Sequence, residues 1–387
     1  MDRVDSIIIG GGVIGLAIAY ELSQRWPDKS ILLLEKEATF GKGLSSRTSE
    51  VIHSGVYYPT DSLKAKLCVS GNRLLYEFCN KWKVPYNKIG KLIIAQDDKD
   101  IETLEFLFRQ AVANEVPSTR LLNSDDITKI EPNIKAQAAL CCPTSGIVDS
   151  HKLMASLAQG AKQNGAMLVY KQEVFGIRMQ SSEYIIDFID ENGDKSSVAC
   201  RALVNAAGLT ADRIASMAGI NVDEAGYRIY RCKGEYFAIT NRKAAMVNNL
   251  IFPVSIRELK GPGIPLIKDL KGRLRLGPDA HYASSTSTDY SVQPGNAAYF
   301  YKTVSSYLTF LELADLQPDI AGLRPRLLVP CGSPPRDFII CHEIERNLPG
   351  FVNLIGIESP GITCCLSLAR YVSEMLEAIL LPKQECF

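Results

Sequence analysis

The first 35 residues alternate between apolar runs and a glycine-rich turn. Residues 6–9 and 30–34 are short apolar runs, and the stretch between them reaches Trp26 with its apolar residues at helical spacing. Short β-branched runs are typical of buried strands, whereas a repeat of about 3.6 residues is typical of a helix. The pattern predicts a strand–helix–strand unit whose first turn reads Gly10-Gly11-Gly12-Val13-Ile14-Gly15.

Two later segments repeat the order of strand, small-residue turn and helix. Residues 201–205 end in Asn205-Ala206-Ala207-Gly208 and precede a helix that we expect from Thr210. Residues 354–357 lead through a Pro-Gly turn into a helix that should reach about Leu381. We expect both turns to pass close to the ligand that the first turn binds.

The rest of the chain has the pattern of a mixed α and β region. Alternating apolar and polar positions over 165–192, with a turn at Glu191-Asn192-Gly193, predict a small antiparallel unit. Elsewhere we expect strands at 227–240 and 272–277, helices at 100–114 and 297–313, and a polar loop at 282–295.

The first turn matches the G-x-G-x-x-G pattern of dinucleotide-binding proteins, in the required setting between a strand and a helix. Gly10 permits the tight turn, Gly12 lets a pyrophosphate approach the backbone, and Gly15 lets helix and strand pack closely. The helix N-terminus then faces the phosphates with its N–H groups. Glu35, 20 positions after Gly15, would accept hydrogen bonds from ribose hydroxyls and disfavours the 2′-phosphate of NADP.

Other segments favour FAD over NAD. The polar residues 44–50 could line an isoalloxazine ring, and the N-terminus of the last helix could stabilise negative charge on the N1–C2=O edge of a reduced flavin. The antiparallel unit would lie beside the adenine. No Cys or His is marked as an attachment point, so we expect non-covalent FAD. The expected cofactor-binding residues are Gly10, Gly12, Val13, Ile14, Gly15, Glu35, Lys36, Ser45, Ser46, Arg47, Ser49, Glu50, Val51, Val174, Ala207, Gly208, Ser359, Pro360, Gly361, Ile362 and Thr363.

Composition narrows the remaining possibilities. The 387 residues suit about two domains, and 43 basic residues balance 43 acidic ones, which argues against a nucleic-acid partner. The 11 cysteines form no CxxC or Cys/His cluster, so we expect reduced thiols and no metal site. A strand pattern begins directly after the N-terminus, and no apolar run reaches the length of a spanning helix. We therefore expect a cytoplasmic protein, without a signal or transit peptide, that makes at most peripheral membrane contact.

Six motifs distributed along the chain resemble one enzyme family. They are SSRTSEVIHSGVYYP at 45–59, SLKAKLC at 62–68, GKLI at 90–93, CKGEYF at 232–237, GLRP at 322–325 and GIESPG at 356–361. Together with the glycine turn, they resemble the D-amino-acid-oxidase-like group of FAD oxidoreductases. Within that group, the chain resembles the L-2-hydroxyglutarate dehydrogenase/oxidase family over nearly its whole length.

This resemblance implies an α/β fold in two parts. One is a Rossmann-like FAD-binding domain of the GR2/DAO type, and the other is an α+β substrate domain built on a mixed sheet. The FAD-binding domain would be discontinuous, over 1–85, 143–218 and 320–387. The substrate domain would take 86–142 and 219–319.

The implied reaction removes a hydride from C2 of a small 2-hydroxy acid to flavin N5 and a proton from its hydroxyl to a base. Of the four histidines, we select His53 as that base because it lies in the segment expected to line the flavin. His281 could approach the site from a surface loop. His151 should start a helix, and His342 should be structural.

A dicarboxylate substrate needs cationic and hydrogen-bonding partners. Arg324 could hold a carboxylate through two parallel hydrogen bonds. Further donors would be Tyr57, Tyr58, Lys233 and Tyr236. The electron acceptor could be oxygen, a quinone or an electron-transfer protein.

One stretch departs from the family pattern. Where the family has G-V-H-x-T, residues 263–267 read Gly-Ile-Pro-Leu-Ile, so Pro265 and Ile267 replace the expected His and Thr. The family's His is thought to lie in the substrate pocket. This departure keeps three alternatives open: an amino-acid or amine oxidase, a dehydrogenase of another hydroxy acid, or a flavoprotein that has lost catalysis and serves as a binding module.

Overall fold

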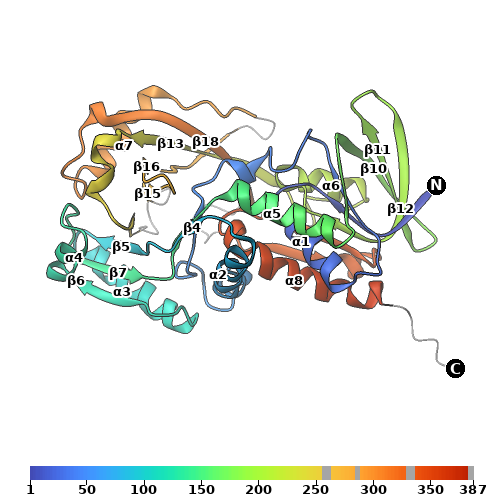
Figure 1. Cartoon of the computed structure of the whole chain (residues 1–387), viewed down its shortest axis with the longest axis horizontal. Helices are drawn as coiled ribbons and strands as arrows, with labels where there is room; N and C mark the ends of the chain where they lie inside the picture. The colour runs from blue at the N-terminus through green and yellow to red at the C-terminus, as the bar shows by residue number, and fades with distance from the viewer. Residues whose placement is uncertain (255–262, 284–287, 328–335, 382–387) are drawn as a thin grey trace. The chain divides into compact units, whose positions relative to one another are not determined.

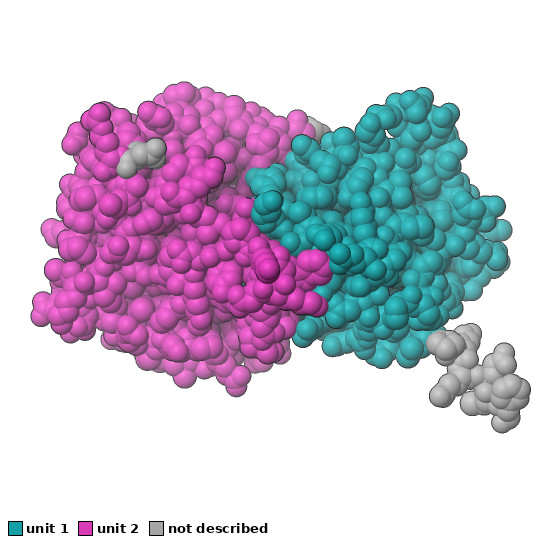
Figure 2. Space-filling view, viewed as in Figure 1, with its two compact units in different colours: residues 1–46, 150–230, 325–387 teal, residues 47–149, 231–324 magenta. Residues whose placement is uncertain are grey.

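The computed structural model describes residues 1–254, 263–283, 288–327 and 336–381. The chain divides into two compact units, coloured separately in Figure 2. Unit 1 comprises 1–46, 150–230 and 325–387, and unit 2 comprises 47–149 and 231–324. This division differs from the expected domain bounds, because residues 47–85, 143–149 and 320–324 group with unit 2, and residues 219–230 group with unit 1.

Unit 1 is built on a sheet whose central strands are parallel. The order is β10-β11-β12-β1-β2-β9, and β12 also pairs with β20, which pairs with β19. The apolar runs predicted as strands are β1 and β2, and they are buried on both faces, as central parallel strands require. The strands are β1 (Asp2–Ile9), β2 (Ile31–Glu35), β9 (Met167–Tyr170), β10 (Gln172–Gln180), β11 (Glu183–Asp190), β12 (Lys195–Asn205), β19 (Ile339–His342) and β20 (Phe351–Ile355).

Helices of unit 1 pack on this sheet and on one another (Figure 1). Helix α1 (Val13–Arg25) contacts both α5 (Ser150–Gln163) and α8 (Gly361–Leu380). Helix α6 (Ala211–Met217) packs against β10 and β20. These positions confirm the two helices that were expected to follow small-residue turns.

Unit 2 is built on a mixed sheet, as the resemblance implied. Its order is β17-β13-β16-β15-β14-β5-β7-β6, with β18 beside β13. The β14–β5 pair is parallel, and the other neighbouring pairs from β17 to β6 are antiparallel. A small sheet holds β3 (Val51–Ile52), β8 (Gly146–Val148) and β4 (Tyr86–Asn87). The strands of the large sheet are β5 (Lys91–Ala95), β6 (Arg120–Asn123), β7 (Ala138–Cys142), β13 (Ile229–Ile239), β14 (Leu250–Pro253), β15 (Leu266–Lys268), β16 (Leu274–Leu276), β17 (His281–Tyr282) and β18 (Leu316–Leu327).

Four α-helices of unit 2 lie within the described residues: α2 (Leu63–Trp82), α3 (Asp98–Ala113), α4 (Ser124–Ile130) and α7 (Ala297–Val304). In α7, Phe300 and Val304 are fully buried in the apolar core on this sheet. Short 3₁₀ turns complete the two units: η1 (Leu44–Ser46), η2 (Gly208–Thr210), η3 (Asn241–Met246), η4 (Pro294–Asn296), η5 (Leu313–Asp315) and η6 (Glu343–Arg346).

Two expectations about local structure were wrong. The helix expected over 297–313 ends at Val304, where two serines follow and Tyr307 turns inward to donate its hydroxyl hydrogen bond to the Ile264 carbonyl. Strand β9 does not join the antiparallel unit, because it pairs in parallel with β2. The rest of that unit is confirmed: β10, β11 and β12 are antiparallel, and the turn at 191–194 joins the last two.

Residues 284–287 of the expected polar loop lie outside the described residues. None of the helices within the described ranges combines the length and the apolar character that crossing a bilayer requires.

Candidate functional site

Two positions in the glycine turn of unit 1 have no room for a side chain. Gly10 has a φ of +111°, and a Cβ there would lie 2.5 Å from the carbonyl oxygen of Ala206. At Gly15, a Cβ would collide with the carbonyl oxygen of Gly10. Both contacts are with backbone, which cannot move aside. The turn therefore runs close against β12 and the start of α1, and it leaves backbone rather than side chains facing a ligand.

The start of α1 is held by residues that are distant in the sequence. The Val13 N–H donates to Ser45 Oγ at 3.0 Å, so the hydroxyl acts as an N-terminal cap supplied by another segment. The Gly11 N–H donates to Glu35 Oε2 at 2.5 Å, and the Glu37 N–H donates to Glu35 Oε1 at 2.9 Å. Glu35 is thereby directed towards the turn from the end of β2.

A hollow of about 510 Å³, open solvent included, lies beside this turn within unit 1. It brings together Gly10, Glu35, Lys36, Val174 and Ala207, all of which were expected to bind the cofactor. The lining also contains residues that sequence reasoning missed: Ile9, Leu34, Gln172, Glu173, Thr210, Arg213 and Ile214. The sequence predicted a helix start near Thr210, and that prediction could have indicated that Thr210, Arg213 and Ile214 line the hollow.

The turn after β12 is held by a buried polar network. Asn205 Nδ2 donates to the Ala211 carbonyl and to Asn353 Oδ1, both at 2.7 Å. Asn353 Nδ2 in turn donates to Glu343 Oε1 at 2.8 Å, and the Tyr227 hydroxyl donates to the same oxygen at 2.7 Å. Because every member of this chain is bonded, the network fixes the turn that carries Ala207 into the hollow.

The expected residues 359–363 lie at the N-terminus of α8, a helix of 20 residues. Gly361 N–H donates to the Glu358 carbonyl at 2.6 Å, and the Glu358 carboxylate pairs with Arg326 at 3.2 Å. The helix end therefore has a defined backbone geometry and a partial positive charge that suits a negatively charged ligand edge. These residues are not among those lining the hollow.

His53 of unit 2 follows β3 and is fixed through its backbone. Its carbonyl accepts a hydrogen bond from Asn72 Nδ2 at 2.8 Å, and its imidazole forms a T-shaped pair with the Phe252 ring, with centroids 6.5 Å apart. Burial, with a smaller contribution from the nearby Lys91, lowers the pKa of His53 to about 3. The imidazole is therefore neutral at physiological pH.

Arg324 of unit 2 lies over the backbone of β13. Its Nη2 donates to the Asp279 carbonyl at 2.7 Å, and its Nη1 contacts the sulfur of Cys232 at 3.8 Å. A Cβ at Gly234 would collide with this guanidinium. The glycine of the Lys-Gly-Glu motif thus makes room for Arg324.

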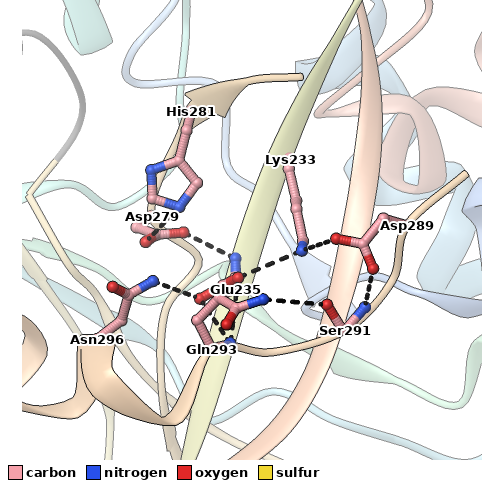
Figure 3. A network of polar contacts seen from close by, with 8 residues as sticks. All are labelled: Lys233, Glu235, Asp279, His281, Asp289, Ser291, Gln293 and Asn296. Carbon is pink, nitrogen blue, oxygen red and sulfur yellow. Dashed lines mark hydrogen bonds and ion pairs between the residues drawn. The ribbon is translucent and has the colours of Figure 1, made fainter. Parts of the chain in front are cut away.

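A polar network surrounds the neighbouring residues of β13 (Figure 3). Lys233 Nζ lies between two carboxylates, 2.7 Å from Asp289 and 3.4 Å from Glu235. Burial opposes its charge, yet the hydrogen bonds to these carboxylates raise the pKa of Lys233. His281 lies beside Asp279, with Nε2 and Oδ2 3.0 Å apart. Lys233 is thus neutralised by protein groups.

The carboxylates of this network are almost fully buried, with Glu235 2% and Asp279 3% exposed. Burial raises the pKa of Asp279, although the charges of His281 and Arg324 oppose that shift. Glu235, Asp279 and His281 offer ligand atoms within 4.8 Å of one another. The Lys233 ammonium, 3.4 Å from Glu235, compensates part of this negative charge within the protein.

The predicted tyrosines have different surroundings. The Tyr57 hydroxyl is buried and makes no hydrogen bond within the described residues, and burial raises its pKa well above the usual value. Tyr58 is half-buried, and its carbonyl accepts from Asn114. Burial raises the pKa of Tyr236 to about 12, and its hydroxyl meets Ser49.

Arg47, expected beside the cofactor, places its guanidinium 4.1 Å from the ring centroid of Tyr290.

Both residues that depart from the family pattern are buried. Ile267 is 2% exposed and packs in an apolar cluster with Val51, Ile147, Tyr236 and Leu250. The Pro265 carbonyl accepts a hydrogen bond from the Gly277 N–H at 2.8 Å.

The remaining histidines have ordinary environments. His151 is exposed at the start of α5, as expected. His342 accepts the Gly350 N–H through Nε2 at 2.8 Å, which agrees with a structural role.

Comparison with known proteins identifies the family. The family model described as FAD-dependent oxidoreductase, DAO, matches residues 5–375. The chain belongs to the DAO family of FAD-dependent oxidoreductases. Its similarity to individual members of that family extends over nearly the full length of the chain, as the relatives and solved structures below show.

Curated relatives of this chain include L-2-hydroxyglutarate dehydrogenases. The mitochondrial enzyme of Arabidopsis thaliana is 35% identical, and the alignment covers 96% of this chain and 83% of that protein. The mitochondrial enzyme of Homo sapiens is 37% identical, with 96% and 88% covered. These relatives confirm the resemblance deduced from the six motifs.

A solved DAO-family structure has the same fold. L-α-glycerophosphate oxidase from Mycoplasma pneumoniae, solved with FAD bound, superimposes with a TM-score of 0.85 at 28% identity, covering 97% of this chain and 95% of that one. A glycine oxidase from Geobacillus kaustophilus, at 22% identity and a TM-score of 0.80, shares the fold.

The residues of unit 1 fit the cofactor of the DAO family. The glycine turn exposes backbone groups to a ligand, and hydrogen bonds to Ser45 and Glu35 hold that turn in place. The hollow beside it is lined by Lys36, Val174 and Ala207, among others. We expect this hollow to hold the adenosine half of FAD, since the pyrophosphate of a dinucleotide lies at such a turn and its ribose beside the acidic end of the second strand. Direct contacts of the individual residues with FAD remain predictions.

Proposed function

We propose that this DAO-family protein oxidises L-2-hydroxyglutarate to 2-oxoglutarate. The observation that carries the proposal is the similarity to the plant and human L-2-hydroxyglutarate dehydrogenases over 96% of the chain. Bound FAD supplies the acceptor for the hydride that leaves C2. The residues of this chain have to bind the dicarboxylate and remove the hydroxyl proton.

His53 is the proposed base. A base must be unprotonated before the reaction, and the low pKa of the half-buried imidazole satisfies that condition throughout the physiological range. Its backbone is anchored by Asn72 and by its position after β3, so the backbone that carries the imidazole is held in place.

Arg324 is the proposed carboxylate-binding residue. A guanidinium has five N–H donors, and the Asp279 carbonyl and the Cys232 sulfur orient the group without supplying a negative charge. Within the described residues Arg324 forms no direct ion pair with a carboxylate, so its remaining N–H donors can pair with the carboxylate of a substrate. Lys233, which two carboxylates already neutralise, is a weaker candidate for the same role.

Flavin bleaching tests the proposal. The purified yellow holoprotein is mixed anaerobically with L-2-hydroxyglutarate, with its D-isomer and with a panel of amino acids, and the flavin absorbance is followed. We expect rapid bleaching by the L-isomer alone. Bleaching only by an amino acid would instead indicate an amino-acid oxidase. A flavin that dithionite reduces but no small acid bleaches would indicate a binding module.

The same reduced protein identifies the electron acceptor. Its reoxidation is measured with oxygen, with a soluble quinone and with an electron-transfer protein, and the fastest of the three reactions identifies the class. A cytoplasmic location remains a prediction from the sequence, which cell fractionation tests.

A further inference from the structure

Strand β13 carries Arg324 and the carboxylate network of Figure 3 on different faces. Cys232 and Gly234 stand two residues apart on this strand and share one face, and the Arg324 guanidinium lies against both. Lys233 and Glu235 point to the other face, where the network lies. The side chains that neutralise Lys233 are therefore not those that set the direction of Arg324.

Asp279 connects Arg324 to the backbone of β13. Its carbonyl accepts a hydrogen bond from Arg324 Nη2 at 2.7 Å. Its carboxylate accepts the Glu235 N–H through Oδ1 at 2.7 Å, and its own N–H donates to the Glu235 carbonyl at 3.4 Å. Asp279 is almost fully buried, so water competes little for these bonds. The exposed His281 approaches the other carboxylate oxygen, Oδ2, and is not part of this connection.

The space around this connection is tightly filled. A Cβ at Gly234 would lie 2.9 Å from the Asp279 carbonyl oxygen and would collide with Arg324 Nη2. The segment before Asp279 lies equally close to β13, because a Cβ at Gly277 would lie 2.6 Å from the Glu235 carbonyl oxygen. The position of the Asp279 carbonyl therefore limits where Arg324 Nη2 can lie.

We propose that Asp279 is a positioning residue for substrate binding, whose carboxylate holds its own carbonyl in the place from which that carbonyl orients the Arg324 guanidinium. Arg324 has further N–H donors besides those that contact Asp279 and Cys232. These donors pair with a substrate carboxylate only when the guanidinium has the correct direction. Asp279 acts through Arg324 and does not itself touch the substrate. This role rests on the proposed function and makes it more specific.

Calorimetric titration of the FAD-loaded protein with glutarate, an unreactive dicarboxylate, tests the proposal. Asp279→Ala removes the bond to the Glu235 N–H and should weaken glutarate binding by about 10- to 100-fold. Asp279→Asn keeps an acceptor oxygen and should bind glutarate within about threefold of the wild type. Wild-type affinity in Asp279→Ala, or an equal loss in both variants, would overturn the proposal. Asp279→Ser, whose shorter side chain cannot reach the Glu235 N–H, gives the same comparison should Asp279→Ala fail to fold.

A double-mutant cycle decides whether Asp279 acts through Arg324. Arg324→Met should weaken glutarate binding on its own, and adding Asp279→Ala to it should cause no further loss. This result is expected because a displaced carbonyl has no guanidinium left to misdirect. Losses that multiply in the double variant would mean that Asp279 acts independently of Arg324, which the proposal does not allow.

Asp100→Ala is the matched control for the loss of a buried aspartate. Asp100 lies in the first turn of α3 in unit 2, is also buried, and accepts the Gln96 N–H through Oδ2 at 2.9 Å. Its replacement removes the same kind of bond, so it should lower the melting temperature but leave glutarate affinity unchanged. An equal loss of affinity in Asp100→Ala would trace the effect to general destabilisation and contradict the proposal.

Steady-state kinetics separate binding from chemistry. With L-2-hydroxyglutarate, Asp279→Ala should raise KM by about 10- to 100-fold and change kcat far less, and Asp279→Asn should restore KM. A fall in kcat with an unchanged KM would contradict a role in substrate binding. If L-2-hydroxyglutarate does not bleach the wild-type flavin, the proposed function fails, and the glutarate titrations still decide whether Asp279 acts through Arg324.

Discussion

At the scale of single residues, three cations of unit 2 differ in what surrounds their charge. Lys233 is neutralised by Asp289 and Glu235, and Arg324 is oriented by uncharged groups. Among the described residues, Lys91 Nζ has no hydrogen-bond partner and lies over the rings of Tyr57 and Phe252. Because a buried charge needs compensation, these differences indicate different roles. Lys233 holds the network together, and Arg324 suits an anionic ligand.

The proposed base leads to a prediction at this scale. His53→Ala should lower the rate of anaerobic flavin reduction by L-2-hydroxyglutarate by roughly two to four decades, because the hydroxyl proton then has no acceptor. Stopped-flow absorbance measures the rate, and the FAD content is checked in parallel. His281→Ala is the matched control, since His281 is exposed and lies beside Asp279. An unchanged rate in His53→Ala with full FAD content would remove His53 from the mechanism.

At the scale of elements, the β1–α1 turn shows why a strand and a helix need glycine where they meet. The backbone of Gly10 is pressed between Ala206 and the start of the helix, and Gly15 packs on Gly10 itself. The helix start is then capped by Ser45, which comes from a different segment. The glycines that the turn requires therefore lie within the element itself, whereas the residue that caps the helix comes from another segment of the chain.

A substitution in this turn tests its role in cofactor binding. Gly15→Ala should weaken FAD binding by about 30- to 1000-fold, since the added Cβ forces the backbone of the turn to move, at about 2–4 kcal/mol. Fluorescence titration of apoprotein with FAD gives the affinity. Gly43→Ala is the control, because a Cβ at Gly43 meets nothing within 4 Å. Equal affinities of the two variants would contradict the assignment of the turn.

At the scale of the whole molecule, each unit is assembled from segments that are far apart in the sequence. Unit 1 takes three segments, and its hollow is lined from around β1, β2, β10 and the start of α6. Unit 2 takes two segments and carries His53, Lys91 and Arg324. The chain thus gathers the expected cofactor-binding turn in one unit and the proposed proton- and carboxylate-binding residues in the other.

Hydrogen exchange tests whether FAD binds at unit 1 and the dicarboxylate at unit 2. Adding FAD to the apoprotein should protect amides of unit 1 in peptides covering 9–15, 34–36, 172–174 and 207–214, because these backbones line the turn and the hollow. Glutarate, added afterwards, should protect peptides of unit 2 around His53 and Arg324. Mass spectrometry of both steps measures the protection, and FAD protection confined to unit 2 would contradict the assignment.

The sequence by itself determined the local features. Strand and helix periodicity, the glycine turn and the acidic residue that ends β2 were predictable, because they depend on the steric limits of a few neighbouring residues. The six motifs identified the family because they extend over nearly the whole chain. The length of α7 was not predictable, since the inward turn at Tyr307 depends on the distant Ile264 carbonyl.

Only the tertiary structure decided which side chains meet. Thr210 and Arg213 join the lining of the hollow, Lys233 is neutralised by Asp289, and Lys91 is enclosed beside two aromatic rings. These outcomes depend on strand pairing and burial between segments that are far apart in the chain. The sequence shows where each lysine, and thus each potential positive charge, stands in the chain. Whether that charge is exposed, paired or enclosed depends on the groups that the fold places around it.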